Sequence, residues 1–380
     1  MANVQDGATT RDLPLRGSNA DAESFEYVSD PHENERRLRG CANVIVATYH
    51  RLLKEDPDLT MPMAAIEALI EFLGHSQVKT VYETIDLVKT QSEKLQAAVR
   101  NPIALSHGTD LFSQYLIMSL KQPASSSSAS NGGSSSKLAS PPLDNPHESF
   151  EVVRQHLLRN SRLFATRAKN ARERIAANGR KHLHDDTTIL TMGGSRVVGN
   201  LLSRAAAKHD YGWYTDPPRR FRVLYAVDPA LQAESDGVVQ SLRAQGIQVA
   251  TIPFTALAYA MGQVDKVIVG AEAVTANGGI ISSMGTYSLA VLAKASRKPL
   301  YVAAEQHKFG KTFPVDNFDF NFDQEVINFY SDNNKEDKAK KVPMPDPVDF
   351  TPPELIEAFF ADHKVLTPDE VAKEVIDMLM

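Results

Sequence analysis

Glycines, a hydroxyl and an arginine follow a short apolar run in the stretch 191–196, TMGGSR. Gly193 and Gly194 would let the backbone approach a ligand closely, and the Ser195 hydroxyl is suited to cap a following helix. Free N–H groups at a helix start attract an anion, and Arg196 adds positive charge. No Gly-Lys-Ser/Thr follows, so this is not a Walker A loop. The pattern predicts either an anion site or a tight turn without a ligand.

A carboxylate and a glycine pair follow a second apolar run, KVIVG at 266–270. Glu272 lies just past this run, where a buried carboxylate is costly unless it is paired or hydrated. In a pocket it could act as a base or bind ligand hydroxyls; the alternative is a carboxylate satisfied by backbone N–H groups. Three further candidate ligand-binding residues follow in the same loop: Asn277, Gly278 and Gly279.

A third candidate loop, SSMGT at 282–286, opens another predicted helix. Its hydroxyls and N–H groups could hold a phosphate, and Gly285 and Thr286 are its candidate residues. Lys308 completes the predicted ligand-binding set. The pair His182 and His184 lacks a third ligand at metal-binding spacing, so no metal site is predicted.

The elements that must position these loops alternate between short apolar runs and helical patterns. The apolar runs predict buried strands at 187–191, 222–227, 248–253, 266–270 and 300–304. Helices are predicted near 196–208, 231–245, 254–262 and 284–297. This alternation predicts a Rossmann-like open parallel sheet, covered on both faces. Because ligands bind beyond the carboxyl ends of such strands, the candidate loops should meet there.

The first half of the chain follows a helical period instead. We predict an all-helical domain over 33–182, with an α/β domain over 183–380. Helices are expected at 63–73, at 78–99, after 108–110 and at 153–175, with a break at Pro102. Near the end, 331–348 is interpreted as a surface loop, and 352–380 should carry one or two helices, one of them starting at Thr367.

Two segments are too polar to bury a core. Residues 1–32 predict a disordered tail, and the Ser-rich stretch 121–142 predicts a disordered insertion between helices.

Residues 151–181 carry nine Lys or Arg and two Glu. That helix indicates either a solvated face or a docking surface for an acidic partner.

Composition narrows the function classes. The 380-residue chain has 41 Lys+Arg and 47 Asp+Glu, a formal net charge of −6, which argues against direct nucleic-acid binding. Cys41 is the single cysteine, which excludes an intrachain disulfide and a cysteine-based zinc site and fits the cytosol. No apolar run approaches the roughly 20 residues of a membrane span, so no membrane partner is expected.

These loops, in this order, resemble one family. It comprises the methylthioribose-1-phosphate and ribose-1,5-bisphosphate isomerases together with the alpha, beta and delta subunits of translation initiation factor 2B, and the likeness is strongest to the alpha branch. It covers the chain from about residue 38 onward, apart from the Ser-rich insertion and the 331–345 loop. The blocks that carry it lie at 54–73 (KEDPDLTMPMAAIEALIEFL), 189–198 (ILTMGGSRVV), 264–314 and 348–368 (VDFTPPELIEAFFADHKVLTP).

The resemblance implies a helical domain followed by a Rossmann-like domain through which members pair. The isomerases of this family use a cysteine in the first loop and an aspartate after the Val-Gly-Ala strand. Here Gly193 or Gly194 stands at the cysteine position, and Glu272 replaces the aspartate. Losing one of two proton-transfer groups costs on the order of 10²–10⁴ in rate, so no catalysis is expected. Ser282 and Ser283 stand where alpha-type members carry Asn-Lys, which removes a phosphate contact.

The resemblance further implies a non-catalytic regulatory subunit of the guanine-nucleotide exchange complex for initiation factor 2, in the cytosol. It implies homodimerisation, contacts with other subunits of initiation factor 2B, and sensing of the phosphorylated alpha subunit of initiation factor 2. No cofactor is implied; a sugar phosphate or a nucleotide is the candidate pocket ligand. Two alternatives remain, a sugar-phosphate isomerase of the ribose-1,5-bisphosphate type and a sugar-phosphate or nucleotide sensor.

Overall fold

The computed structural model describes residues 44–121, 155–327 and 347–379, with short gaps. The gaps are 57–58, 77, 79, 100–101, 156–157, 160–161, 164–165, 168–169, 211–214, 230–231, 321–323 and 325. The predicted tail at 1–32, almost all of the Ser-rich insertion and most of the 331–348 loop therefore lie outside the described residues.

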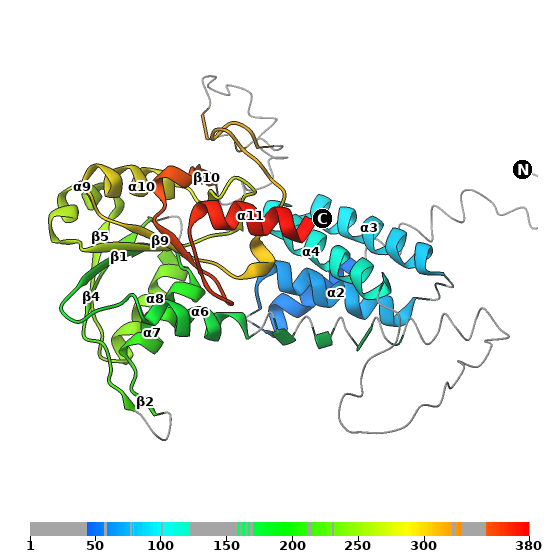
Figure 1. Ribbon diagram of the computed structural model, residues 1–380, viewed down its shortest axis with the longest axis horizontal. Coiled ribbons are helices and arrows are strands. Elements are labelled where there is room, and N and C mark those ends of the chain that lie inside the picture. The colour runs from blue at the N-terminus through cyan, green and yellow to red at the C-terminus, as the bar shows by residue number, and fades with distance from the viewer. Residues whose placement is uncertain are drawn as a thin grey trace, which may run out of the picture. The chain divides into compact units, whose positions relative to one another are not determined.

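Helices make up the first half of the described chain. Residues 44–55 are helical, and α2 (Met61–His75), α3 (Val81–Ala98) and α4 (Pro102–Lys121) follow (Figure 1). Their apolar faces share one core, with Ile66, Leu95 and Phe112 fully buried. The predicted break near Pro102 is confirmed, since α3 ends at Ala98 and α4 begins at Pro102. The helix predicted after 108–110 starts earlier, at Pro102 itself, because the first helical position does not need the N–H that proline lacks.

A seven-stranded sheet in the order β12-β11-β9-β6-β1-β4-β5 forms the second half. The five predicted strands are confirmed and run parallel: β1 (Thr188–Met192), β4 (Arg222–Val227), β5 (Gln248–Pro253), β6 (Lys266–Gly270) and β9 (Leu300–Ala303). β11 (Ala358–Phe360) and β12 (Val365–Leu366) extend the sheet where only helices were predicted. Runs of two or three residues are too short to show a strand period.

Helices cover both faces of this sheet, which confirms the Rossmann-like α/β prediction (Figure 1). Ile189 and Ile268 pack on the side of α6 (Ala171–Arg180), α7 (Arg196–Ala206) and α8 (Gln232–Ala244). Leu190 and Val267 point the other way, toward α9 (Leu257–Ala260), α10 (Thr286–Ala295) and α11 (Pro368–Leu379). Adjacent residues face opposite layers because a strand alternates its side chains, so strands buried on both faces are apolar throughout.

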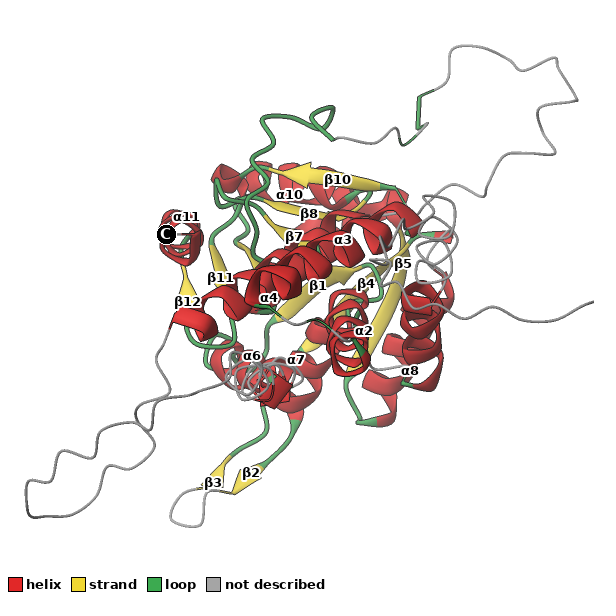
Figure 2. Cartoon of the chain, turned by 90° about the vertical axis from the view of Figure 1, so that its right-hand side faces the viewer, coloured by secondary structure: helices red, strands yellow, loops and turns green. Residues whose placement is uncertain are grey.

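A smaller antiparallel sheet, β10-β8-β7, lies beside α10 (Figure 2). It consists of β7 (Ala273–Val274), β8 (Ile280–Ser283) and β10 (Val348–Thr351), and it pairs Asp349 with Ser282. The predicted third loop therefore begins inside a strand. The predicted helix start at Thr367 is confirmed, since its hydroxyl accepts from Glu370 N at 3.3 Å while the Glu370 carboxylate accepts from Thr367 N at 2.8 Å.

Candidate functional site

The order of the large sheet reverses between β1 and β6, because the chain builds β1, β4 and β5 to one side and then β6 and β9 to the other. Such a switch point opens a crevice beyond the carboxyl ends of the two strands. A cavity of about 230 Å³ lies there, which we call the carboxyl-edge pocket. Seven predicted residues line it: Gly193, Gly194, Ser195, Arg196, Glu272, Thr286 and Lys308.

The first loop is a tight left-handed turn at the mouth of this pocket. Gly193 and Gly194 have φ of 71° and 48°, a region that residues with side chains rarely adopt. A Cβ on Gly194 would lie 2.7 Å from the Cβ of Glu234. Ser195 caps α7, its Oγ accepting from Val198 N at 3.5 Å, and it also packs against Gly270. Backbone conformation thus favours glycine at both positions, and at Gly194 a larger side chain would also need its neighbour to shift.

Arg196 begins α7 and connects the pocket to the helical half of the chain. Both of its terminal nitrogens lie 3.4 Å from the carbonyl oxygen of Leu59. Thr60, Met61 and Pro62 at the start of α2 line the same cavity. The helical half and the sheet thus share one pocket.

A buried ion-pair cluster closes another wall of the carboxyl-edge pocket. Glu305, with 1% of its side chain exposed, lies 2.9 Å from Lys308 Nζ and 3.6 Å from Arg172 Nε. Lys308 Nζ also donates to Ala271 O at 2.9 Å. Burial, the largest single influence, raises the pKa of Glu305, but the charges of Lys308 and His307 together with the hydrogen bonds to the carboxylate lower it by more, so the pKa falls to about 2. Lys308 is therefore partly neutralised before any ligand arrives.

The N-terminus of α10 already holds an internal carboxylate. Asp349 Oδ2, on β10, accepts from Gly285 N at 2.6 Å and from Tyr287 N at 3.0 Å. Burial raises the pKa of Asp349 to about 6, although the two N–H donors oppose the rise. The N–H groups that suggested a phosphate site in this loop are thus directed at Asp349.

Four predicted residues do not line the carboxyl-edge pocket. Asn277 bonds within its own turn and donates to Pro314 O at 2.8 Å. Gly278 and Gly279 leave no room for a Cβ against Pro368 and Phe350, and Gly285, at φ 100°, lies against the ring of Phe254. These positions shape the small sheet and the helix start that support the pocket.

Sequence reasoning did not include Arg172, Glu234 or Glu305, or the α2 residues in the lining. Glu305 follows β9, which lies beside β6, so the rule that places sites at carboxyl strand ends could have found it. Arg172 and the α2 residues carry no local signal, because they reach the pocket only through packing.

His107 ties α4 to the loop that carries Lys308. Its Nδ1 lies 2.9 Å from Lys308 O and its Nε2 lies 2.6 Å from Thr312 Oγ1. Burial lowers the pKa of this imidazole, which favours the neutral ring. A neutral ring with partners on both nitrogens acts here as a fixed connector.

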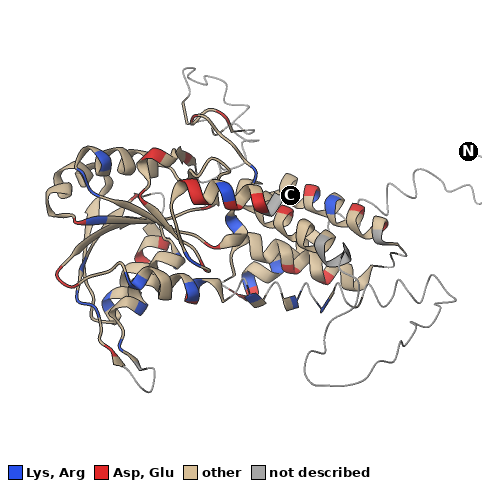
Figure 3. Cartoon of the chain, in the orientation of Figure 1, with Lys and Arg blue, Asp and Glu red and all other residues tan. Residues whose placement is uncertain are grey.

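Basic and acidic residues are interspersed over the described elements (Figure 3). Along α6, the described end of the basic segment 151–181, three arginines meet carboxylates of the α/β half: Arg172 with Glu305, Arg174 with Asp362 at 3.0 Å, and Arg180 with Asp216 at 2.9 Å. The positive charge of α6 thus joins parts of the molecule.

Neither a metal cluster nor a membrane helix is found in the described part of the chain. No group of three or more His, Cys, Asp or Glu could hold a metal ion within the described ranges. Among the described helices, none has the length and apolar character needed to cross a bilayer.

Comparison with known proteins gives consistent relatives. The chain is 27% identical over 349 residues to the Dictyostelium discoideum protein named translation initiation factor eIF2B subunit alpha, covering 88% of this chain and 96% of that one. A Caenorhabditis elegans protein of the same name is 26% identical over 88% of this chain and 98% of its own length. Ribose 1,5-bisphosphate isomerase of Archaeoglobus fulgidus is 34% identical over 43% of this chain and 49% of its own length.

The fold has solved counterparts as well. The crystal structure of eIF2B beta from Chaetomium thermophilum matches with a TM-score of 0.65 at 19% identity, over 91% of this chain and 94% of that one. A chain of the tetrameric eIF2B-beta2-delta2 complex from C. thermophilum matches with a TM-score of 0.63 at 17% identity, over 92% of this chain and 100% of that one. The model of the Initiation factor 2 subunit family matches residues 54–368, which include α2 to α4, the large sheet and every residue of the carboxyl-edge pocket. The chain therefore belongs to the Initiation factor 2 subunit family.

Proposed function

We propose that this chain is a non-catalytic, alpha-type regulatory subunit of the guanine-nucleotide exchange complex for initiation factor 2. The observation that carries the proposal is its likeness to eIF2B subunit alpha of D. discoideum, which spans 88% of this chain and 96% of that one. An alignment of this length includes the helical half as well as the sheet. The work of such a subunit is in the cytosol.

The geometry of the first loop supports a role without turnover. The isomerases of the family place a cysteine in this loop, and here its two candidate positions are left-handed glycines. A thiol at Gly194 would need a strained backbone and would meet Glu234. Glu272 remains in the pocket, but one carboxylate without a second proton-transfer group loses on the order of 10²–10⁴ in rate.

The subunit would form a homodimer and join the other subunits of initiation factor 2B. Exposed apolar side chains on α9 and α10 support pairing: Tyr259 is 92% exposed, Tyr287 37% and Val291 42%. It would sense phosphorylated initiation factor 2 alpha through the helical half. The shared wall of the carboxyl-edge pocket, where α2 and α4 meet the sheet, would connect that half to the rest.

A sugar phosphate is the pocket ligand that the geometry favours over a nucleotide. The volume of about 230 Å³ suits a small metabolite. The start of α7, with Arg196, would hold a single phosphate, because Asp349 occupies the start of α10. Glu272 and Thr286 would bind hydroxyls.

The principal test is a binding experiment with the tagged full-length chain. It is mixed with the other subunits of initiation factor 2B, and then with initiation factor 2 in phosphorylated and unphosphorylated form. We expect the subunits to be retained and the phosphorylated factor to be preferred. Retention of neither would refute the proposal.

A ribose-1,5-bisphosphate isomerase is the second candidate, favoured by the 34% identity to the A. fulgidus enzyme over 162 residues. Purified protein should show no turnover of ribose 1,5-bisphosphate. Isomerisation that disappears in Glu272→Gln would replace the regulatory assignment with an enzymatic one.

Ligand binding is tested separately by thermal shift with a sugar monophosphate. A ligand at about 100 times its Kd stabilises the native state by roughly 2.7 kcal/mol, so the melting temperature should rise in the wild-type chain. The rise should shrink in Arg196→Gln and persist in Arg297→Gln, a change of the same charge beyond the C-terminus of α10. An equal rise in both variants would mean that the ligand binds outside the carboxyl-edge pocket.

A further inference from the structure

A second cavity lies at the opposite end of the large sheet. It is formed where β4 and β5 begin, with a volume of about 710 Å³, and we call it the amino-edge pocket. Its charged lining residues are Arg219, Arg220, Arg222 and Asp186, which sum to +2 in a chain whose net charge is −6. The family resemblance and the switch point of the sheet predict a ligand site at the carboxyl edge only, so neither explains this second cavity.

The lining arginines are incompletely partnered. Arg219 donates to Asp216 at 3.2 Å, but its Nε is buried and has no hydrogen-bond partner among the described residues. Arg220 and Arg222 are exposed, and their guanidinium groups have no ion pair or hydrogen bond within the described part of the chain. A buried guanidinium N–H without a partner is a donor that a bound group can satisfy.

The backbone that carries these arginines is held on both sides. Arg219 N donates to Ala205 O at 2.9 Å, and Arg220 N donates to Asp185 Oδ1 at 2.7 Å. The carbonyl oxygen of Arg220 accepts from Asp186 N at 2.7 Å, and Arg222 N donates to Thr187 O at 2.9 Å. The arginines therefore project from a fixed edge, which reduces the entropy lost when they bind a ligand.

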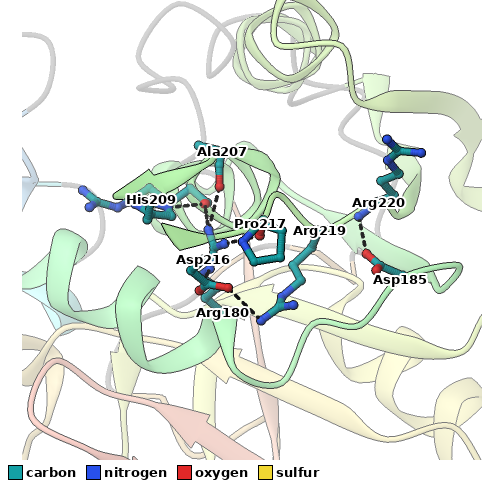
Figure 4. Close-up of polar contacts among 9 residues, drawn as sticks. Arg180, Asp185, Ala207, His209, Asp216, Pro217, Arg219 and Arg220 are labelled. Carbon is teal, nitrogen blue, oxygen red and sulfur yellow. Dashed lines mark hydrogen bonds and ion pairs between the residues drawn. The ribbon is translucent and has the colours of Figure 1, made fainter. Parts of the chain in front are cut away.

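Arg180 forms hydrogen bonds that hold the segment leading to these arginines in place (Figure 4). It is 4% exposed and donates to Asp216 at 2.9 Å and to the carbonyl oxygens of Arg204, Ala207 and Pro217 at 2.6, 2.8 and 2.7 Å. Asp216 is thus shared between Arg180 and Arg219. One carboxylate for two guanidinium groups leaves positive charge beside the pocket.

We propose that the amino-edge pocket binds a phosphate-bearing small molecule through Arg219, Arg220 and Arg222. The planar guanidinium group matches phosphate oxygens with two parallel hydrogen bonds, which makes arginine the preferred residue for such groups. Gln245 and Gln248 line the same cavity, and their amides can bind the polar remainder of the ligand. Phe221 is only 7% exposed, so the pocket offers no aromatic face for stacking a base.

Calorimetric titration of inorganic pyrophosphate into the full-length chain tests the site. We expect binding at low ionic strength that weakens at high salt. Arg220→Gln with Arg222→Gln should weaken it by a factor of about 100 or more, since the loss of each charge-assisted bond weakens binding by a factor on the order of ten. Asp186→Asn should tighten it about threefold by removing the opposing charge. Asp186 has φ 59°, a conformation that asparagine tolerates.

Two matched variants fix the location. Arg297→Gln with Lys298→Gln removes the same charge just before β9, a strand that β6 and β1 separate from β4 in the sheet. This double variant should leave pyrophosphate binding unchanged. Arg196→Gln removes the phosphate contact proposed at the carboxyl-edge pocket. The pyrophosphate binding that Arg220→Gln with Arg222→Gln weakens should persist in this variant, so this proposal can fail independently of the proposed function. Absence of binding, or binding lost in Arg196→Gln and kept in the Arg220/Arg222 variant, would overturn the proposal.

Discussion

The carboxyl-edge pocket and the amino-edge pocket lie at opposite ends of one sheet and handle charge in opposite ways. At the carboxyl edge, Glu305 pairs with Lys308 and Arg172, and Asp349 fills the start of α10. At the amino edge, the guanidinium groups of Arg220 and Arg222 have no ion pair or hydrogen bond among the described residues. Internal pairing stabilises a fold, whereas unpaired charge is available to a ligand. The two edges should therefore respond differently to the same kind of mutation.

The largest expected effect is the loss of the buried carboxylate at the carboxyl edge. Glu305→Gln leaves Lys308 and Arg172 without their counter-charge, and breaking one side of a buried pair costs about 3–5 kcal/mol. Urea unfolding should show a drop of this order in the free energy of unfolding. Glu357→Gln, an exposed change in the same half, should stay within about 0.5 kcal/mol. Equal stability of the two variants would contradict the pairing.

A smaller loss is expected at the first loop. Gly194→Ala imposes a left-handed alanine, at about 1–2 kcal/mol, and brings its Cβ against Glu234. The matched control is Gly237→Ala inside α8, where no atom lies within 4 Å of the new Cβ. That change should stabilise by about 0.5–1 kcal/mol, because alanine has the higher helix propensity. Thermal unfolding of both variants distinguishes the effects by sign.

The pH dependence of stability isolates Asp349. Its folded pKa of about 6 lies above the ordinary aspartate value of 3.8, so the native state binds the extra proton. The stability that this proton contributes falls as pH rises from about 4 to about 6. Asp349→Asn removes this proton uptake, and its stability relative to wild type should increase by about 1–2 kcal/mol over that window, allowing for the dipole of α10. Urea midpoints at both ends of the window measure the difference, and parallel pH profiles would exclude the assignment.

His307 changes stability with pH in the opposite direction to Asp349. It is present in both the wild-type chain and the Asp349→Asn variant. Burial lowers its pKa to about 4, so the unfolded state gains the proton first as pH falls below about 6.5, and stability declines toward pH 4. The Asn variant retains this decline, which separates the two groups.

The smallest effect on stability is expected at the amino edge. Arg220→Gln with Arg222→Gln removes exposed, unpaired charges, so the free energy of unfolding should change by less than about 0.5 kcal/mol. Denaturation of this double variant beside Glu305→Gln gives the sharpest contrast between the edges. A decrease in the free energy of unfolding close to that of Glu305→Gln would mean that these arginines stabilise the fold.

Residue pattern predicted the central sheet closely, with β4, β5 and β6 at their expected bounds. Strands buried on both faces must be apolar throughout, so they can be predicted from the local sequence without knowing which strands they pair with. The short β11 and β12 were missed, because two or three residues show no period. At the site, the loops after β1 and β6 were predicted from glycines, a hydroxyl and a carboxylate placed just beyond apolar runs.

The sequence by itself determined the alternation of strands and helices, the family, and the residue types at the carboxyl ends of β1 and β6. These properties are local, since side-chain period, turn chemistry and motif order are written along the chain. Only the tertiary structure decided that Asp349 would take the start of α10, that Glu305 would pair with Lys308 and Arg172, and that three arginines would line a cavity before β4. These pairings join residues far apart in the chain, and packing alone determines which charges find partners.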